Sequence, residues 1–367
     1  MKNNKLVSII TFFFVGLNIS LGQSNKKLRQ ELSNKIATYY NNNQFSGTVL
    51  VAKKGDVLYN EAFGYANIEK KIKNKTSTQF LIGSLTKPFT ATAIMHAKER
   101  GLLDLHVPLK KYIPELNDEL GRLTVHLLMK NSSGLPVHLN RITKLEYRDI
   151  TSKELITLYN TVKLAFTPGT KYDYSNLNYQ LCAIVLERIS GISYKEYLET
   201  NVFDPIKMTS SGIERTSLIA KNKALGYDLE NSIMKRAEVN YMAYAKGGGD
   251  IYSTAKDILK WDKALYTENL VSEESKKLMF DGKPGEYGSY GYGFKIKEYT
   301  RNVKGDKKGK LVRHGGSMYG YICNVHRYLN DEVTIIVLGN MRPYPTMEIT
   351  LKIEEILRSH GCFKRNQ

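Results

Sequence analysis

The spacing of apolar and polar residues predicts strands near both ends of the chain and helices in its middle. Leu28–Tyr40 has the periodicity of an amphipathic helix, and two apolar runs around Lys54-Gly55-Asp56 predict a β-hairpin. Apolar residues at helical spacing predict a last helix over 349–357. Three apolar runs before that helix, separated by glycine-rich or Asn-Asp turns, predict more strands: Leu311–Arg313, Tyr321–Tyr328 and Val333–Leu338.

The middle of the chain has helical periodicity. Leu177, Leu181 and Ile184 repeat at the spacing of one helix face, and Ser193 with Glu196 has the form of a capping box that opens the next helix. Together with the strands at both ends, this pattern predicts an α+β fold (an α/β sandwich). We expect an antiparallel sheet built from both chain ends and flanked by helices, with an all-helical subdomain inserted over roughly residues 100–250.

The first 22 residues have the pattern of a secretory signal peptide. Lys2 and Lys5 precede an apolar stretch, and Ser20 and Gly22 place small residues at the −3 and −1 positions of a cut before Gln23. The alternative is a transmembrane anchor, but the apolar run is shorter than the ~20 residues that a span needs. We therefore expect a single catalytic domain over 23–367, exported to the periplasm or secreted by a bacterium, without stable membrane insertion after cleavage.

The net charge and the number of cysteines indicate which classes of partner and of cross-link to expect. The chain has 367 residues, 54 of them Lys or Arg and 36 Asp or Glu, which gives a formal net charge of +18. No nucleic-acid-binding motif accompanies these lysines, so we interpret them as a solvated surface and expect no nucleic-acid partner. The three cysteines are too few for a disulfide framework, and we expect Cys182 and Cys323 to be buried as small apolar residues.

The candidate chemistry lies in three short motifs. Ser-x-x-Lys occurs four times, beginning at Ser24, Ser84, Ser232 and Ser253. The copy Ser84-Leu85-Thr86-Lys87 is followed by Tyr174-Ser175-Asn176 and then by His314-Gly315-Gly316, each of which occurs once. Three residues apart on a helix, a serine and a lysine share one face, and a neutral lysine can then take the proton of the serine hydroxyl. Ser84 is therefore the candidate nucleophile.

These motifs resemble those of the serine β-lactamase-like superfamily, especially its branch of class C β-lactamases, penicillin-binding D,D-peptidases and esterase-like hydrolases. The family motifs Ser-x-x-Lys, Tyr-x-Asn and Lys/His-x-Gly appear in order. Three further segments match the family: Ser133-Gly134-Leu135-Pro136, Phe166-Thr167-Pro168-Gly169 and the Gly-Gly-x-x-Ser-Thr segment over 248–254. The resemblance implies the same α+β fold, with the active site in the cleft between the sheet and the helices.

The resemblance also implies residue roles. Ser84 would be the nucleophile, and Lys87 and Tyr174 would titrate together as its base, so the assignment of the base between the two stays open. A nearby lysine cation would hold Tyr174 near its phenolate form. Asn176 would hold Lys87 and the substrate, and the backbone N–H groups of Ser84 and Ser317 would form the oxyanion hole, with Gly316 allowing a close approach.

The third motif departs from the β-lactamase pattern, which usually has lysine there to hold the carboxylate of the drug. His314 would be only partly charged near pH 7. Arg313 or Arg342 are alternative sources of charge for the cleft. The tyrosine-rich stretch Gly285–Phe294 either lines the cleft or forms a mobile loop.

We therefore predict an exported serine hydrolase that forms an acyl-enzyme on Ser84 and acts on an ester or amide, as an esterase or D-amino-acid peptidase does. Two alternatives stay open: a β-lactamase or penicillin-binding D,D-carboxypeptidase, and an envelope sensor that is acylated without turnover. The expected partner is a small-molecule, peptide or ester substrate, including molecules derived from the cell wall. The scattered histidines and the lack of paired Cys-x-x-Cys lead us to expect no metal and no cofactor.

Overall fold

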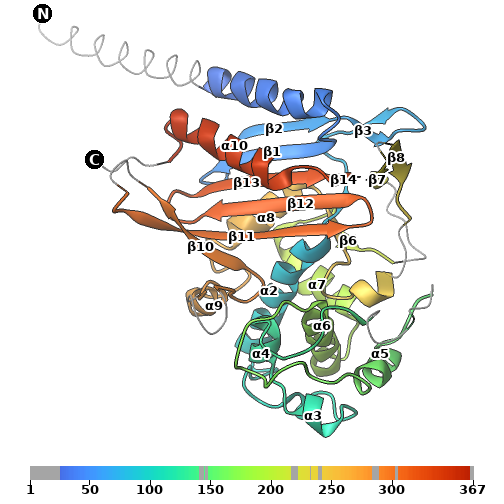
Figure 1. Cartoon of the computed structure of the whole chain (residues 1–367). Helices are drawn as coiled ribbons and strands as arrows, with labels where there is room; N and C mark the ends of the chain where they lie inside the picture. The colour runs from blue at the N-terminus through green and yellow to red at the C-terminus, as the bar shows by residue number, and fades with distance from the viewer. Residues whose placement is uncertain are drawn as a thin grey trace, which may run out of the picture.

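A six-stranded antiparallel sheet forms the upper part of the molecule in Figure 1, and it is built from both ends of the chain. The computed structural model describes residues 25–139, 144, 148–215, 222–231, 233–238, 242–282, 289–301 and 305–363. The predicted signal peptide, 1–22, lies outside these residues. In sheet order the strands are β10 (Lys295–Thr300), β11 (Lys308–Met318), β12 (Tyr321–Tyr328), β13 (Val333–Gly339), β1 (Gly47–Lys53) and β2 (Asp56–Phe63).

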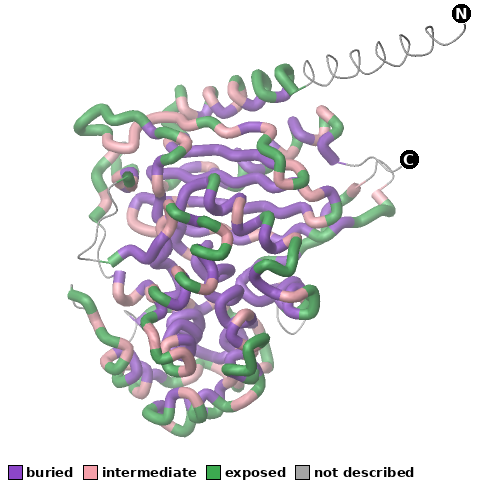
Figure 2. Tube along the Cα trace, turned by 180° about the vertical axis from the view of Figure 1, so that it is seen from behind, coloured by how far each residue is buried: buried purple, intermediate pink, exposed green. Residues whose placement is uncertain are grey.

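The register of the sheet joins the two ends of the chain directly. β1 pairs with β13 so that Val49 lies opposite Val337, and β1 and β2 form the predicted hairpin. β1 and β13 are mainly apolar and are buried along nearly their whole length (Figure 2), so both faces of this part of the sheet are covered. The predicted α+β class and the antiparallel sheet are therefore confirmed.

Helices cover both faces of the sheet. One face packs against the helix at residues 25–41 and against α10 (Thr346–Ser359), through buried residues such as Leu32, Ile36 and Ile353. On the opposite face, Trp261 of α8 (Ala255–Ala264) stacks between Phe89 and Phe294, with ring centroids 4.3 and 5.9 Å away. Trp261 is thus a core residue.

The helical part of the chain lies below the sheet in Figure 1 and surrounds α2 (Thr86–Glu99) and α6 (Asn176–Ser190). Its capping pattern differs from the prediction. Ser193 accepts a hydrogen bond from Glu196 N, but the full reciprocal capping box is formed by Thr151 and Glu154. The other helical segments are η1 (Gly83–Leu85), η2 (Leu109–Lys111), α3 (Asp118–Gly121), α4 (Val125–Met129), α5 (Ser152–Tyr159), α7 (Tyr194–Leu198), η4 (Glu199–Phe203), η5 (Asp204–Ile206), η6 (Met242–Ala245) and α9 (Glu273–Met279).

Short strands connect the helical part to the sheet, and the apolar pattern does not predict them because each has only two to four residues. They form small sheets of the orders β5-β9-β6, β14-β7-β8 and β3-β4. Their bounds are β3 (Tyr65–Asn67), β4 (Ile72–Lys73), β5 (Phe80–Leu81), β6 (Gly212–Ile213), β7 (Tyr227–Glu230), β8 (Ile233–Arg236), β9 (Ile251–Ser253) and β14 (Met341–Arg342).

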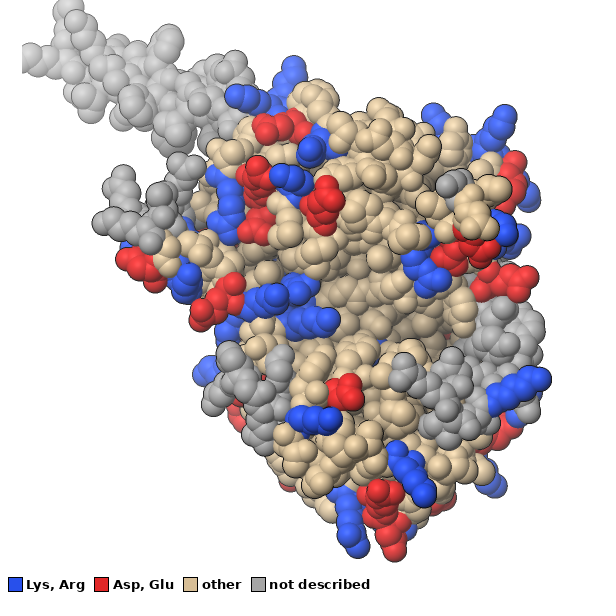
Figure 3. All heavy atoms as spheres, in the orientation of Figure 1, with Lys and Arg blue, Asp and Glu red and all other residues tan. Residues whose placement is uncertain are grey.

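On the face shown in Figure 3, basic and acidic side chains are mixed, and the hollow between the sheet and the helical part is mainly free of both. Within the described ranges, no helix is both long enough and apolar enough to cross a membrane. Cys182 and Cys323 are buried and free, as expected.

Candidate active site

Ser84 and Lys87 lie where a 3-10 turn passes into a long helix. Ser84 belongs to η1, and Lys87 follows in the first turn of α2, where Pro88 is tolerated because its missing N–H would have no partner there. The Nζ atom of Lys87 lies 3.1 Å from Ser84 Oγ. The Lys87 side chain is fully buried, whereas Ser84 is partly exposed. The predicted serine–lysine pair is thus in hydrogen-bonding contact.

Lys87 has two further hydrogen-bond partners. Its Nζ atom donates to Asn176 Oδ1 at 2.6 Å and to the carbonyl oxygen of Gly248 at 2.8 Å. Burial lowers the pKa of Lys87 to about 7, against an opposing effect of the Asp250 carboxylate. A neutral lysine keeps two N–H donors and one lone pair. The carbonyl oxygens of Asn176 and Gly248 accept from these two N–H groups, so the lone pair of the neutral amine is directed to the hydroxyl of Ser84.

Tyr174 and Asn176 reach the site from the start of α6. Ser175 caps this helix by accepting a hydrogen bond from Leu177 N at 3.2 Å, so Asn176 occupies its first turn. The Lys87 Nζ atom lies 4.9 Å from the centre of the Tyr174 ring. Burial raises the pKa of the Tyr174 phenol. The expectation that a lysine cation holds Tyr174 near its phenolate form is therefore wrong, because burial dominates and also favours the neutral form of Lys87.

The third motif lies on β11, which packs directly on η1. A Cβ atom added to Gly316 would lie 1.9 Å from the Ile82 carbonyl oxygen and 2.8 Å from Ser84 N. On the other side, a Cβ atom on Gly83 would lie 3.0 Å from Ser317 N. Glycine at 316 therefore lets the two backbones touch, which brings Ser317 N next to the turn that carries Ser84.

His314 is a buried neutral side chain. Its Nδ1 atom lies 2.6 Å from the Gly315 carbonyl oxygen, and its Nε2 atom lies 3.0 Å from the Tyr290 hydroxyl. These contacts assign the proton to Nδ1, with Nε2 accepting from Tyr290. Burial, and then the charge of Lys87, lower the pKa of His314 to about 3. The expected partial charge of His314 near pH 7 is therefore a wrong prediction.

Neither arginine named from the sequence supplies charge to this site. Arg342 binds Asp228 at 2.7 Å. Arg313 precedes His314 on β11, and successive strand residues point to opposite faces of the sheet, so Arg313 faces away from Ser84. In the stretch Gly285–Phe294, residues 285–288 lie outside the described residues, and Tyr290, Tyr292 and Phe294 are buried.

A cavity of about 560 Å³ opens beside Ser84. Lys144 is the one lysine or arginine among its described lining residues. The lining residues are Ser84, His138, Leu139, Lys144, Asn176, Leu177, Gln180, Tyr244, Ala245, Gly248, Gly249, Ser317, Met318 and Tyr319. In the described part of the chain, no group of three or more His, Cys, Asp or Glu side chains could hold a metal ion.

Four residues near the site were not singled out from the sequence. The Gly248 carbonyl oxygen accepts a hydrogen bond from Lys87, and Asp250 lies two residues further along the chain. The Tyr290 hydroxyl fixes the tautomer of His314. His138 Nδ1 lies 3.1 Å from Asn176 Nδ2. The segment over 248–254 did carry a family resemblance, but that match gave Gly248 and Asp250 no role. Tyr290 lies in the tyrosine-rich stretch 285–294, for which a place in the cleft was one of two predictions, and His138 follows the family match over 133–136, but neither segment gave these two side chains a role.

Comparisons with known proteins agree with this geometry. The sequence model of the family described as Beta-lactamase matches residues 32–355. Penicillin-binding protein 4* of Bacillus subtilis is 29% identical over 331 residues, which are 85% of this chain and 72% of the relative. Putative penicillin-binding protein PbpX of the same organism is 32% identical over 262 residues, 71% of this chain and 65% of the relative.

Similarity extends to solved structures. The octameric penicillin-binding protein homologue from Pyrococcus abyssi superposes with a TM-score of 0.79 and 28% sequence identity, over 90% of this chain and 77% of that one. The match of the family model covers most of the chain, including all three motifs. The chain therefore belongs to the β-lactamase family, whose members related to it include penicillin-binding proteins.

Proposed function

We propose that this chain is an exported serine hydrolase that forms an acyl-enzyme on Ser84 and acts on an uncharged ester or amide. In this proposal, residues 1–22 are removed as a signal peptide and 23–367 form one catalytic domain. The single observation that carries the proposal is the contact of 3.1 Å between Lys87 Nζ and Ser84 Oγ, made by a buried lysine whose other partners are two carbonyl oxygens.

In the proposed first step, neutral Lys87 accepts the proton of the Ser84 hydroxyl while Ser84 Oγ attacks the substrate carbonyl carbon. Asn176 Oδ1 and the Gly248 carbonyl oxygen stay bound to the lysine and keep its lone pair on the serine. These two carbonyl oxygens also stabilise the ammonium form of Lys87, whose third N–H points to Ser84 Oγ. A lysine pKa of about 7 supports Lys87 as the base, because the ordinary value near 10.4 leaves almost no neutral amine at neutral pH.

Backbone donors would stabilise the tetrahedral intermediate. The N–H groups of Ser84 and Ser317 are the candidates, since Gly316 packs against the turn that carries Ser84. Collapse of the intermediate breaks the bond to the leaving group, which takes a proton from Lys87 directly or through the Tyr174 hydroxyl. A phenol with a raised pKa suits this relay, because it carries a proton to donate. Water then attacks the acyl carbon while Lys87 accepts its proton. Collapse of this second tetrahedral intermediate breaks the bond between the acyl carbon and Ser84 Oγ, and Ser84 Oγ takes the proton back from Lys87.

The charge of the cavity supports an uncharged substrate around the scissile bond. His314 is neutral, Arg313 faces away and Arg342 binds Asp228, so none of these three side chains offers a substrate carboxylate a cation at the third motif. An ester or a D-amino-acid amide, including one derived from the cell wall, fits this arrangement better than a β-lactam.

A second candidate function is that of a penicillin-recognising D,D-carboxypeptidase or β-lactamase. Lys144 lines the cavity and offers a cation for a carboxylate, and two relatives carry the name penicillin-binding protein. A protein of this second type that is acylated without turnover would act as a sensor, and the rate of deacylation separates the two.

The test compares three substrate types on the purified mature protein: p-nitrophenyl butyrate, D-alanine p-nitroanilide and a chromogenic cephalosporin. We expect the highest kcat/KM for the ester and loss of all hydrolysis in Ser84→Ala. Ser253→Ala is a matched control, because Ser253 also begins a Ser-x-x-Lys motif. Persistent hydrolysis in Ser84→Ala would refute the proposal, and a preference for the cephalosporin would favour the second candidate.

A further inference from the structure

The segment Met242–Asp250 separates the Ser84 cavity from a second cavity. Tyr244, Ala245, Gly248 and Gly249 line the first. Neighbouring residues of the same segment, among them Lys246 and Asp250, line the second, which has a volume of about 310 Å³. The segment is thus a thin partition with one face toward the nucleophile and the other toward a polar cavity.

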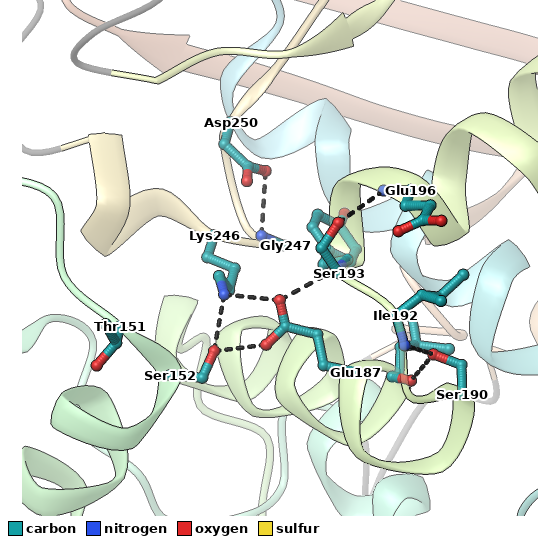
Figure 4. Close-up of polar contacts among 12 residues, drawn as sticks. Thr151, Ser152, Glu187, Ser190, Ile192, Ser193, Glu196, Lys246, Gly247 and Asp250 are labelled. Carbon is teal, nitrogen blue, oxygen red and sulfur yellow. Dashed lines mark hydrogen bonds and ion pairs between the residues drawn. The ribbon is translucent and has the colours of Figure 1, made fainter.

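Hydrogen bonds hold this partition against α2. Thr90 Oγ1 donates to the Gly247 carbonyl oxygen at 2.7 Å, and Lys87 Nζ donates to the next carbonyl, that of Gly248. Gly247 N in turn donates to Asp250 Oδ1 at 3.1 Å (Figure 4). Gly247 has a φ of +66°, and a Cβ atom there would lie 2.4 Å from the Tyr179 carbonyl oxygen. The carboxylate of Asp250 therefore closes a tight turn that carries an acceptor of the candidate base.

Asp250 is a buried carboxyl group without an ion-pair partner among the described residues. It is 3% exposed, and its side chain accepts a hydrogen bond from Gly247 N. Lys246, the nearest lysine on the same segment, instead binds Glu187 and Ser152, each at 2.8 Å (Figure 4). Burial raises the pKa of Asp250 to about 7, against smaller opposing effects of Lys246 and Arg215.

The titratable groups around this region come from several elements. Those that line the second cavity with Asp250 are Asp149, Glu187, Tyr194, Lys195, Glu214, Arg215 and Lys246. Around Lys87 itself, the neighbours Tyr174, Tyr179 and His314 are neutral groups at pH 7, because burial raises the pKa of both phenols and lowers that of the imidazole. Asp250 is the one charged group that acts on Lys87 among the described residues.

We propose that Asp250 is a positioning residue for the proposed acylation: it holds the Gly247–Gly249 turn that binds Lys87, and its negative charge stabilises the protonated form of that lysine. The proposal rests on the proposed function for its catalytic consequence, but the link between the two side chains is testable without it. The charge of Asp250 raises the pKa of Lys87, whereas burial lowers it. An ionised Asp250 keeps Lys87 from becoming too weak a base, and a protonated Asp250 releases the lysine to the neutral form at lower pH.

The first test measures the titration of Lys87 directly, by NMR of protein labelled with [13Cε]lysine and assigned with Lys87→Arg. In Asp250→Asn, which keeps an oxygen acceptor for Gly247 N, we expect the midpoint to fall by about one pH unit. Glu187→Gln is the matched control, because Glu187 lines the same cavity but binds Lys246, and it should leave the midpoint unchanged. Asp250→Ser should give the same shift as Asp250→Asn and replaces that variant if it does not fold.

The second test is the pH profile of kcat/KM for p-nitrophenyl butyrate. We expect the acid limb of Asp250→Asn to move to lower pH by the same amount as the NMR midpoint. Unchanged midpoints in both Asp250 variants would overturn the inference, as would an equal shift in Glu187→Gln. A shifted midpoint without Ser84-dependent hydrolysis would refute the proposed function alone and leave the link between Asp250 and Lys87 in place.

Discussion

The two walls of the Ser84 cavity have different chemistry. The helix wall, formed by η1, α2 and α6, presents Ser84, Lys87 and Asn176, joined by side-chain hydrogen bonds. The strand wall, formed by β11, lines the cavity with Ser317 and Met318, and the buried, neutral His314 and the close contact at Gly316 lie on the same strand. In the proposed mechanism, proton transfer therefore belongs to the helix wall, while the strand wall supplies shape and backbone donors. Substitutions on the helix wall should therefore cost more activity.

Removal of the base should have the largest effect. In Lys87→Ala, no side chain accepts the Ser84 proton, and we expect kcat for p-nitrophenyl butyrate to fall by about 10³-fold, within the range for loss of general base catalysis. Steady-state kinetics measures the change. Lys98→Ala, in the last turn of the same helix, is the control and should keep wild-type activity. More than a tenth of the wild-type kcat in Lys87→Ala would assign proton transfer to another group.

The closest contact between the two walls should be the next most sensitive point. In Gly316→Ala, the added methyl group would lie 1.9 Å from the Ile82 carbonyl oxygen, so β11 must move away from Ser84. We expect a loss of about 10²-fold in kcat/KM from the misplaced backbone donors and a destabilisation of about 1–3 kcal/mol from overpacking.

Gly315→Ala is the matched control for this prediction, because its Cβ atom would meet Cys323 O at the longer distance of 3.0 Å. Kinetics and thermal unfolding of both variants give the comparison. Equal activity in the two variants would show that the approach of β11 to Ser84 is unimportant for the reaction.

The pH profile of kcat/KM should reflect the titration of Lys87 on the helix wall and should show no titration of His314 on the strand wall. Because the pKa of Lys87 is lowered to about 7, protonation below this pH removes the base, and kcat/KM should fall tenfold per pH unit on the acid side. His314 should add no limb between pH 5 and 8, since its pKa is lowered to about 3. A profile of kcat/KM from pH 5 to 9 measures this, and a flat profile across pH 7 would contradict the role of Lys87.

The side chain of His314 should have the smallest effect on ester hydrolysis. His314→Gln removes no charge, because the histidine is already neutral, and glutamine can still accept from Tyr290. We expect kcat/KM for the uncharged ester to stay within about fivefold of wild type, the size of one neutral hydrogen bond. A loss of 10²-fold or more, measured in the same assay, would give the strand wall a direct part in the chemistry.

The two walls also differ in how well the sequence predicts them. The spacing of Ser84 and Lys87 predicted their contact, because the two residues lie one helical turn apart, and the resemblance to the family implied the contact of Asn176 with Lys87. The protonation states of His314 and Tyr174 were predicted wrongly, because they depend on burial, which long-range packing decides. For the same reason, the sequence alone does not reveal Asp250, because its effect on Lys87 depends on a fold that brings α2 next to the segment 242–250.

Whether Ser84 forms an acyl-enzyme can be measured by intact-mass spectrometry of the mature protein, incubated with p-nitrophenyl butyrate and with a penicillin and sampled over time. Peptide mapping then locates any adduct. The account predicts a butyryl group on the peptide that contains Ser84, formed faster as the pH rises through about 7 and absent from Ser84→Ala. An adduct that persists in Ser84→Ala, or that maps to another residue, would contradict it.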